Sequence, residues 1–400
     1  MKRLFAVLGI LMACSTIFFS RADADLLPWN PRVIVVVPPA MAITAGWHHT
    51  CALFKNGSVR CWGRNHKGQL GDGGPIVFGA SSVKPAPVTG LTDTKALEAG
   101  EDQTCALLSN GSIKCWGGNE SGQLGIGSVP PTASSTPLLV TELNDAETVA
   151  AGRQSTCAVD ASGDVHCWGQ NYLADLQGSY QEKYKLSPWK VPGISFADAV
   201  DVGGSHACAR KTNNTVLCWG WDGSGQVGDG GDIEPNDFQN TPTQVSGLTN
   251  AADIFLGDQH SCVVTPGGAA AKCWGDSEYG QLGEPIPTDR ATPIVVPGLD
   301  NVKKIASGGH HTCALLTDGS VQCWGANNFG QIGTGAQSGG IVETPTSVVG
   351  VSGATDIAAG YNHTCAVLSN GYISCWGQNA YGQLGDETKT NRPTPVRVHW

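Results

Sequence analysis

The chain has 400 residues, a formal net charge of −10 at pH 7 and only 14% charged residues. The negative balance argues against nucleic acid as a partner, because binding to a phosphate backbone requires an excess of Lys and Arg. The length exceeds that of most single domains, but a repeat architecture grows by adding units, so one domain is expected.

The N-terminal residues 1–24 have the features of a secretory signal peptide. Met1-Lys2-Arg3 supplies positive charge, an apolar stretch runs from Leu4 to Phe19, and Ala22-Asp23-Ala24 fits a cleavage site. The sequence therefore predicts export to the periplasm or the extracellular space. No other segment approaches the roughly eighteen apolar residues of a membrane-spanning helix.

A lipid anchor is the competing interpretation of the same segment. Leu11-Met12-Ala13-Cys14 resembles a lipobox, which would acylate Cys14 and hold the chain at the cell envelope. The apolar residues Ile17, Phe18 and Phe19 argue against it, since a mature lipoprotein usually begins with a polar tether. The choice between cleavage after Ala24 and lipidation at Cys14 stays open.

Cysteine recurs in pairs ten residues apart, with one extra residue inside the fifth pair, and Trp-Gly always follows the second cysteine. The pair returns about every fifty residues, a period typical of solenoids, arrays and propeller blades. Seven copies predict a closed ring. The pairs are Cys51 with Cys61, Cys105 with Cys115, Cys157 with Cys167, Cys208 with Cys218, Cys262 with Cys273, Cys313 with Cys323, and Cys365 with Cys375.

Each repeat contains four short runs that Gly, Asn and Pro bound. An apolar run leads into Ala-Gly, one run passes through each cysteine, and the last contains Pro and Val. Four short antiparallel strands make one blade, so the sequence predicts an all-β, seven-bladed β-propeller over residues 43–400. The Pro-rich lead-in of residues 25–42 contains a similar run, Val33 to Val37, and the chain ends on another, Pro395 to Val398. One of these two runs is expected to complete a blade across the ring closure.

The spacing of the cysteines predicts the hairpin between them. Direct pairing of Cys105 with Cys115 leaves the loop Ser109-Asn110-Gly111, and such loops require positive φ at the third residue, usually Gly. The fourth repeat has Asn214 there, the next most suitable residue. This register brings the two Cα atoms to about 4.5 Å, which a disulfide tolerates. Together with export it predicts one disulfide in each blade, and the spacing disfavours zinc.

The combined motifs carry a family resemblance. Ala359-Gly360-Tyr361-Asn362-His363-Thr364, the Asn370-Gly371 hairpin, Trp376-Gly377-Gln378-Asn379 and Gly382-Gln383-Leu384-Gly385 resemble the repeat of the regulator of chromosome condensation family, in seven copies over residues 43–398. The resemblance implies a seven-bladed propeller whose glycines and Trp-Gly tryptophans are scaffold. Paired cysteines are not general in that family. The inserted β-hairpin wedge that its nuclear exchange factor uses on a small GTPase is not visible here.

The loops of one ring face vary in chemistry, whereas the Asn-Gly hairpins of the other face are nearly invariant. Aromatic, acidic and amide groups around a propeller mouth have the composition of a protein-binding hot spot; the alternative is a solvated rim with partly buried aromatic side chains. Secreted propellers of this repeat type that inhibit β-lactamase use this kind of face. The candidate binding residues are Trp47, His48, Glu101, Asp102, Arg153, Gln154, Tyr172, Trp221, Asp258, Gln259, Tyr279, His310, Phe329, Tyr361, Asn362 and Tyr381.

Signals for catalysis and metal binding are weak. A histidine recurs two residues before the first cysteine, but Gln103 and Ser155 fill the same position, so a structural hydrogen bond to neighbouring backbone is expected. The dinucleotide-like pattern from Gly223 to Gly228 is only one of the Gly-Gln-Leu-Gly loops. The acidic loop from Asp229 to Asp237 could hold calcium, although its spacing fails the EF-hand pattern and a solvated loop explains it.

The sequence therefore predicts a secreted, monomeric, non-enzymatic propeller that binds an extracellular or envelope protein as an adaptor, receptor-like or inhibitor module. No cofactor and no metal are expected. A glycan-binding or polysaccharide-acting propeller is the alternative, and a guanine-nucleotide exchange role by family analogy is less favoured. Light sensing, the role of the plant ultraviolet photoreceptor of the family, is disfavoured because only Trp47 among the tryptophans follows a turn glycine.

Overall fold

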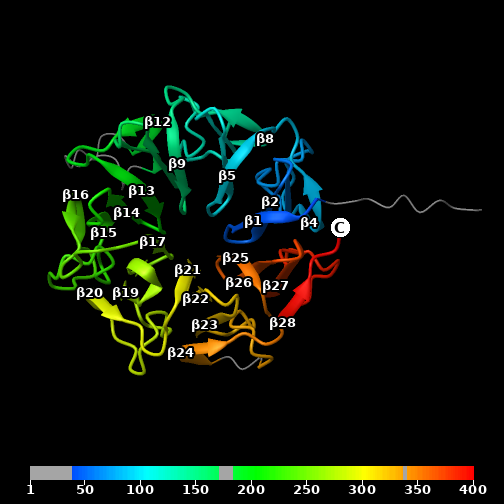
Figure 1. Cartoon of the computed structure of the whole chain (residues 1–400). Coiled ribbons are helices and arrows are strands. Elements are labelled where there is room, and N and C mark those ends of the chain that lie inside the picture. Colours follow the sequence, from blue (N-terminus) through cyan, green and yellow to red (C-terminus); the bar gives the residue numbers. More distant parts are fainter. Residues whose placement is uncertain (1–37, 171–182, 337–339) are drawn as a thin grey trace, which may run out of the picture. The chain divides into compact units, whose positions relative to one another are not determined.

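The computed structural model describes residues 38–170, 183–336 and 340–400. The signal segment, Cys14, the run Val33 to Val37 and Tyr172 lie outside the described residues. Seven separate four-stranded antiparallel sheets follow one another around a ring (Figure 1). The predicted all-β, seven-bladed propeller with four strands per blade is confirmed. Within the described residues no helix is long and apolar enough to cross a membrane.

The first strand of each blade lies nearest the ring axis, and the fourth lies outermost (Figure 1). The first strands are β1 (Ala40–Ala45), β5 (Thr94–Ala99), β9 (Ala146–Ala151), β13 (Ala197–Val202), β17 (Asp253–Leu256), β21 (Val302–Ser307) and β25 (Ala354–Ala359). The second strands are β2 (His49–Phe54), β6 (Gln103–Leu108), β10 (Ser155–Asp160), β14 (His206–Lys211), β18 (His260–Val264), β22 (His311–Leu316) and β26 (His363–Leu368).

The third strands carry the second cysteine and Trp-Gly, and the fourth strands carry the Pro-containing run. The third strands are β3 (Val59–Arg64), β7 (Ile113–Gly118), β11 (Val165–Gln170), β15 (Val216–Trp221), β19 (Ala271–Gly275), β23 (Val321–Ala326) and β27 (Ile373–Gly377). The fourth strands are β4 (Ser81–Pro87), β8 (Ala133–Leu139), β12 (Tyr184–Lys190), β16 (Phe238–Gln244), β20 (Arg290–Val295), β24 (Ile341–Ser347) and β28 (Arg392–Arg397). A single 3-10 turn, η1 (Pro266–Gly268), accommodates the extra residue of the fifth hairpin.

The predicted hairpin register is confirmed in every blade. Cys105 pairs directly with Cys115, and the turn closes with a hydrogen bond from the Gly111 amide to the Leu108 carbonyl oxygen. Gly111 has φ 82°, and Asn214 adopts φ 65° in the corresponding place of the fourth blade. Both residues thus supply the positive φ that the three-residue loop requires.

All seven predicted disulfides are confirmed, and each lies within one blade. Their Cα atoms are 4.0 to 4.1 Å apart, and the bridges are buried in the blade cores. Each bridge therefore ties the second strand of its blade to the third. The bonds join Cys51 and Cys61, Cys105 and Cys115, Cys157 and Cys167, Cys208 and Cys218, Cys262 and Cys273, Cys313 and Cys323, and Cys365 and Cys375.

The Trp-Gly tryptophans join neighbouring blades, as the motif predicted. All seven are fully or almost fully buried. The Trp116 indole N–H donates to the carbonyl oxygen of Gln69 in the preceding blade, at 3.0 Å. An added Cβ at Gly71 would lie 2.7 Å from the same indole nitrogen, so a residue without a side chain lets the ring fit there. The Trp62 indole repeats the bond across the ring closure, to the Gln383 carbonyl oxygen at 2.8 Å.

Among the described strands none is exchanged between repeats, so the C-terminal run does not complete a blade of another repeat as the sequence had allowed. Strand β28, which contains the C-terminal Pro395 run, is the fourth strand of its own repeat's sheet, and β1 is the first strand of blade 1. Each repeat supplies all four of its strands because its frame begins at the axial strand. Side-chain and backbone hydrogen bonds between blades 7 and 1 then close the ring, as in the bond from the Ile43 amide to the Asp356 carboxylate at 3.0 Å.

The recurring histidines are structural, but their partner differs from the expected backbone group. His49 Nε2 lies 2.9 Å from Thr104 Oγ1 of the next blade, and that hydroxyl donates to the Gln69 carbonyl oxygen. The hydroxyl therefore accepts from an Nε2–H. Burial lowers the pKa of His49 to about 3, so the ring is neutral at ordinary pH. The other histidines of this position, each with a Thr or Ser of the next blade, are His206, His260, His311 and His363.

Candidate functional site

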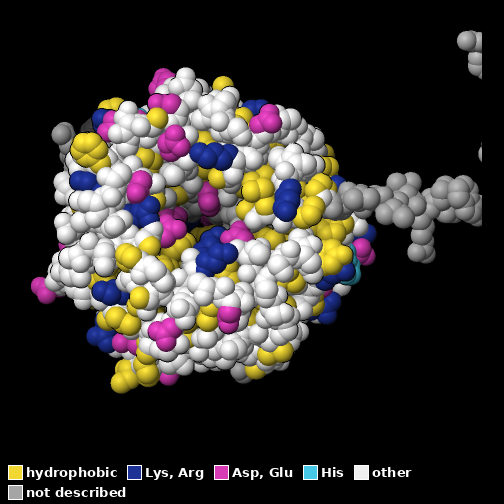
Figure 2. Space-filling model, in the orientation of Figure 1, with side chains coloured by type: hydrophobic (Ala, Val, Ile, Leu, Met, Phe, Trp, Pro, Cys, Tyr) yellow, Lys and Arg dark blue, Asp and Glu magenta, His cyan; other side chains and the backbone are white. Residues whose placement is uncertain are grey.

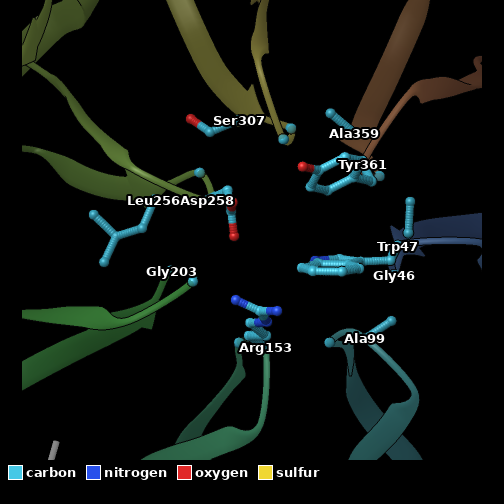
Figure 3. Close-up of a pocket in the computed structure, with 18 of the residues that line it drawn as sticks. Gly46, Trp47, Ala99, Arg153, Gly203, Leu256, Asp258, Ser307, Ala359 and Tyr361 are labelled. Carbon is cyan, nitrogen blue, oxygen red and sulfur yellow. The ribbon is translucent and has the colours of Figure 1, made fainter. Parts of the chain in front are cut away.

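Seven tight turns, one between the first and second strands of each blade, meet around the ring axis (Figure 3). A closed series of backbone hydrogen bonds joins each turn to its neighbour. In each of the seven bonds the amide of the first residue donates to the carbonyl oxygen of the second, at 2.9 to 3.4 Å. The pairs are Trp47 to Gly100, Glu101 to Gly152, Arg153 to Gly203, Gly204 to Asp258, Asp258 to Gly308, Gly309 to Tyr361, and Tyr361 to Trp47. We call this series the axial belt.

The axial belt depends on the glycine that ends each Ala-Gly run. A Cβ added at Gly46 would lie 2.3 Å from the carbonyl oxygen of Gly100 in the next blade. Any side chain there would push the two turns apart and break the belt. The belt therefore holds the backbone of every blade at the axis through main-chain groups alone, accepting at the turn glycine in four bonds and at the next residue in three, and the side chain of that next residue can differ.

That next residue forms an inner ring of side chains around the axis. Five of the seven positions carry side chains, and the fourth and sixth blades have glycine, at Gly204 and Gly309. Four of these side chains, those of Trp47, Arg153, Asp258 and Tyr361, line a cavity of about 70 Å³ together with the belt backbone. Figure 3 shows these four pointing toward the centre from different blades. The inner ring consists of Trp47, Glu101, Arg153, Asp258 and Tyr361.

Aromatic and charged side chains of the inner ring contact each other. The ring centroids of Trp47 and Tyr361 lie 4.6 Å apart. The Arg153 guanidinium carbon lies 5.0 Å from the centroid of Trp47, and Arg153 Nε lies 3.4 Å from Glu101 Oε2. Arg153 thus combines a cation–π contact with an ion pair at one side of the cavity.

The two glycines of the inner ring make room for their neighbours. A Cβ on Gly204 would lie 2.3 Å from Asp258 Oδ1, and a Cβ on Gly309 would lie 2.7 Å from the Tyr361 ring. Asp258 therefore extends over the fourth blade and Tyr361 over the sixth. Burial raises the pKa of the Asp258 carboxyl, and burial together with the Asp258 charge raises the pKa of Tyr361.

The following residue of each turn forms a second ring that contacts the Gly-Gln-Leu-Gly loops. Gln69 Nε2 donates to Asp102 Oδ1 at 2.7 Å, and Ser121 Oγ donates to Gln154 Oε1 at 2.9 Å. The Asp102 carboxylate is thus engaged inside the protein rather than free at the surface, and burial raises its pKa to about 6. The second ring consists of His48, Asp102, Gln154, Ser205, Gln259, His310 and Asn362.

Tyrosines of the outer loops stack on histidines of the second ring. Tyr381 lies 5.0 Å from His48 and Tyr279 lies 4.7 Å from His310, between ring centroids. His310 Nε2 also lies 3.1 Å from the Tyr361 hydroxyl, which links the outer loop to the inner ring. Phe329 is half-buried in the corresponding loop of the sixth blade. The structure thus brings most of the predicted residues into one connected surface.

We call the opening of the axial cavity the mouth. A second hollow of about 470 Å³ lies beside it, over the third, fourth and fifth blades. Trp221, a predicted residue, lines it. The sequence did not indicate Gln170 or Phe238, because they belong to β11 and β16 rather than to the variable turns. Side chains with amide, hydroxyl, guanidinium and aromatic groups line this side pocket: Arg153, Gln154, Gln170, Ser205, Trp221, Phe238 and Gln259.

Charged residues on the axial strands also lie near the site, and the sequence pattern did not indicate them. The Lys304 ammonium lies 2.6 Å from Asp356 Oδ1. Burial, followed by repulsion from Asp201, raises the pKa of Glu98 to about 8, and burial raises the pKa of Asp201 to about 7. Their positions in the sequence indicate this placement, because Glu98 and Asp201 immediately precede Ala99 and Val202, which line the mouth.

Figure 2 shows Asp and Glu side chains, with Lys and Arg among them, around the central hollow. The blades run counter-clockwise in Figure 1, whose orientation Figure 2 shares, and clockwise in Figure 3. The two views therefore show opposite faces of the ring. Charged groups surround the axis on the face opposite the mouth as well.

Metal ligation finds no support in the part of the chain that the structure describes, where no three His, Cys, Asp or Glu residues gather as a metal site. In the acidic loop Asp229 Oδ1 accepts a hydrogen bond from the Gly231 amide, and Asp237 Oδ1 accepts one from the Phe238 amide. These carboxylates stabilise their own turns.

The fold and the diversified mouth define a seven-bladed propeller with one variable loop face. The model of the RCC1-like domain matches residues 25–300 and 133–400, and the chain belongs to this family.

The Arabidopsis thaliana ultraviolet-B receptor UVR8 is 29% identical over 90% of this chain and 82% of its own length. The human E3 ubiquitin-protein ligase HERC2 is 27% identical over 95% of this chain, which spans only 8% of that ligase. The structure of Prp20p from Saccharomyces cerevisiae superimposes with a TM-score of 0.73 at 22% identity, covering 91% of this chain and 86% of Prp20p.

Proposed function

We propose that this chain is a secreted, non-enzymatic binding module that holds a protein partner on the face around the axial belt. The proposal rests on a contrast within each axial turn, between its backbone and the side chain that follows the turn glycine. The backbone turn recurs in every blade and is held by the belt, while the side chain that follows the glycine differs. A rigid surface with clustered aromatic groups and a few charges is typical of interface hot spots.

The disulfides support export as the setting of this function. Fourteen cysteines form seven buried bridges, a pattern that belongs to oxidising compartments. The signal-like segment of residues 1–24 leads to the same proposal. Anchoring through Cys14 would keep the ring at the envelope and leave the binding role unchanged.

The relatives limit the roles that can be proposed for this chain, but they do not identify a partner. UVR8 is a receptor by name, but its light-sensing role is not transferred, since Trp47 is the one tryptophan of the inner ring. The HERC ligases extend far beyond the region that this chain matches, so their activity is not transferred either. We therefore propose an adaptor, receptor-like or inhibitor module.

Affinity capture from envelope extracts and culture fluid tests the proposal. The bait is the mature exported chain, and the matched baits are Tyr361→Ala at the mouth and Lys55→Glu on the hairpin face. We expect at least one protein to be retained by the wild type and by Lys55→Glu, and lost with Tyr361→Ala. Retention that depends on Lys55 and ignores Tyr361 would place the binding face on the other side of the ring.

Glycan binding is the second candidate, and the side pocket is the observation that favours it. Trp221 and Phe238 provide aromatic surface, and Gln154, Gln170 and Gln259 provide amides. Aromatic walls with a few convergent polar groups suit a small polar ligand, and about 470 Å³ lies within the range of such sites. A glycan array probed with wild type and Trp221→Ala tests it. Binding that disappears in the variant supports a lectin role.

A further inference from the structure

Asp258 is an acidic side chain at the centre of the mouth. Arg153, the only basic side chain of the inner ring, forms its ion pair with Glu101, at 3.4 Å. The charges of Arg153 and His310 act on Asp258 from farther away, and Gln259 makes a hydrogen bond with its carboxyl. No ion pair involves Asp258 within residues 38–170, 183–336 and 340–400, and its carboxyl is substantially removed from solvent. A carboxylate held in this way is stabilised by any cation that reaches it.

The walls beside Asp258 are aromatic. Trp47 and Tyr361 lie next to each other with 4.6 Å between ring centroids, and both rings face the cavity in Figure 3. The contact of Arg153 with Trp47, at 5.0 Å, shows that a guanidinium fits against one of these rings. Aromatic faces combined with a carboxylate are the recognition elements for organic cations.

The size of the cavity limits the occupant. About 70 Å³ is far below the volume of a site for a drug-sized ligand, roughly 300 Å³ or more. It admits the end of one side chain. A small molecule or a group that projects from a larger partner can reach it, whereas a bulky ligand cannot, because the axial belt surrounds the opening with fixed backbone.

Further carboxyls lie beneath the mouth. Lys304 is paired with Asp356, and Glu98, Asp201 and Asp253 lie near that pair on the axial strands. The pKa values of Glu98, about 8, and Asp201, about 7, leave both groups only partly ionised at neutral pH, so a cation held nearby would favour their ionisation.

We propose that the mouth is a receptor for one cationic side chain, a lysine or arginine at the tip of a loop on the partner protein. The charged end lies between Asp258 and the ring of Tyr361, next to Trp47, and Arg153 stays over Trp47 and paired with Glu101. The proposal rests on the proposed function and specifies the chemistry of the partner.

Small cations test the receptor without the partner. Methylguanidinium and n-butylammonium are the probes, and N-methylurea and n-butanol are the neutral counterparts. Fluorine NMR of protein labelled with 5-fluorotryptophan reports binding through the Trp47 resonance, which Trp47→Phe assigns. We expect both cations to bind at least about tenfold more tightly than their neutral counterparts, equivalent to about 1.4 kcal/mol.

The variants locate the effect. Asp258→Asn keeps the shape and removes the charge, and should weaken cation binding about tenfold. Asp145→Asn removes the same charge on the far face and should change nothing. Tyr361→Leu removes an aromatic wall without changing the charge and should weaken binding at least about threefold, so the test stands even if Asp258→Asn misfolds.

Equal binding of cations and neutral counterparts overturns the proposal, as does unchanged cation binding in correctly folded Asp258→Asn. The two proposals fail separately. A captured partner that depends on Tyr361 but is held equally by Asp258→Asn leaves the binding module intact and removes the cation receptor.

Discussion

The second strand of every blade lies between an axial turn and a hairpin turn, and different contacts stabilise these two turns. In the hairpin turns the side chains themselves complete the turn, as Asn56 Oδ1 accepts from the Ser58 amide and Asn110 Oδ1 accepts from the Ser112 amide. In the axial turns the backbone belt and the buried histidines carry that role. Side chains that complete a turn are restricted to short hydrogen-bonding residues, mostly Asn and Asp, whereas those next to a backbone belt are not. Uniform hairpins and a varied mouth follow from this difference.

The carboxylates of the two regions differ in the same sense. In the hairpins, hydrogen bonds from their own turns lower the pKa values of Asp160 and Asp318. Around the axis, burial raises the pKa values of Glu101, Asp258 and Glu98. Hairpin carboxylates stabilise the fold as anions, and axial carboxylates cost stability as anions. A cost of this kind is expected of residues kept for recognition.

The largest expected effect concerns the scaffold that both regions share. Trp324→Ala should lower the free energy of unfolding by about 3 to 5 kcal/mol, because it empties a buried contact between blades and breaks the bond to the Gln281 carbonyl oxygen. Thermal or urea unfolding measures this loss. An unchanged melting temperature together with lost partner binding would show that this tryptophan serves recognition instead.

The second effect concerns the bridge behind one hairpin. Replacing Cys313 and Cys323 by Ala should cost about 2 to 3 kcal/mol, the entropy of an eleven-residue loop, or less because the hairpin is already ordered. Peptide mass mapping of the exported protein should find only bridges within blades. Bridges between blades, or free thiols in the exported chain, would contradict the pairing.

The repeated motifs made the fold predictable. Part of the site was not predictable, because contacts between residues that are distant in the sequence form it. The cysteine spacing and Gly111 determine a hairpin within eleven residues, and copying it seven times produces the ring. The axial belt joins residues about fifty positions apart, so the sequence could place Trp47 and Tyr361 on one face but could not show that they touch. Phe238 of the side pocket comes from a fourth strand, where the pattern shows only Pro and Val. The frame of a repeat cannot be derived from its period, which is why the sequence left open whether the C-terminal run belongs to its own repeat.

The third effect is on binding and tests the contrast directly. Trp47→Ala should weaken partner binding by about 2 kcal/mol, because truncating an aromatic anchor exposes its pocket. Folding should change little, since the belt uses the Trp47 backbone and not its side chain. The charge reversals Asp145→Lys and Lys55→Glu lie on the hairpin side and should be silent in titration calorimetry. Loss of binding in these controls with full binding by Trp47→Ala would assign recognition to the uniform face.

The smallest effect compares one carboxylate from each region and depends on pH. The pKa of Glu98 is raised to about 8, so folding loses stability as pH rises from about 4.5 to 8 and Glu98 ionises more readily in the unfolded chain. Glu98→Gln should therefore stabilise the protein above pH 8 and leave it unchanged below about pH 4.5. The expected gain is about 1 to 2 kcal/mol, less than for a fully buried group, because Glu98 keeps some contact with solvent.

Asp160→Asn is the matched change in a hairpin and should act with the opposite sign. The pKa of Asp160 is lowered, so its anion stabilises the fold above the pKa that the residue has in the unfolded chain, and this stability is lost as pH falls through the folded pKa. Removing the charge should therefore destabilise the protein at neutral pH and matter progressively less in acid. Melting temperatures of both variants across the pH range should diverge on the alkaline side. Parallel curves would show that the axis and the hairpins treat their carboxylates alike, and that the acidic axis carries no cost in stability.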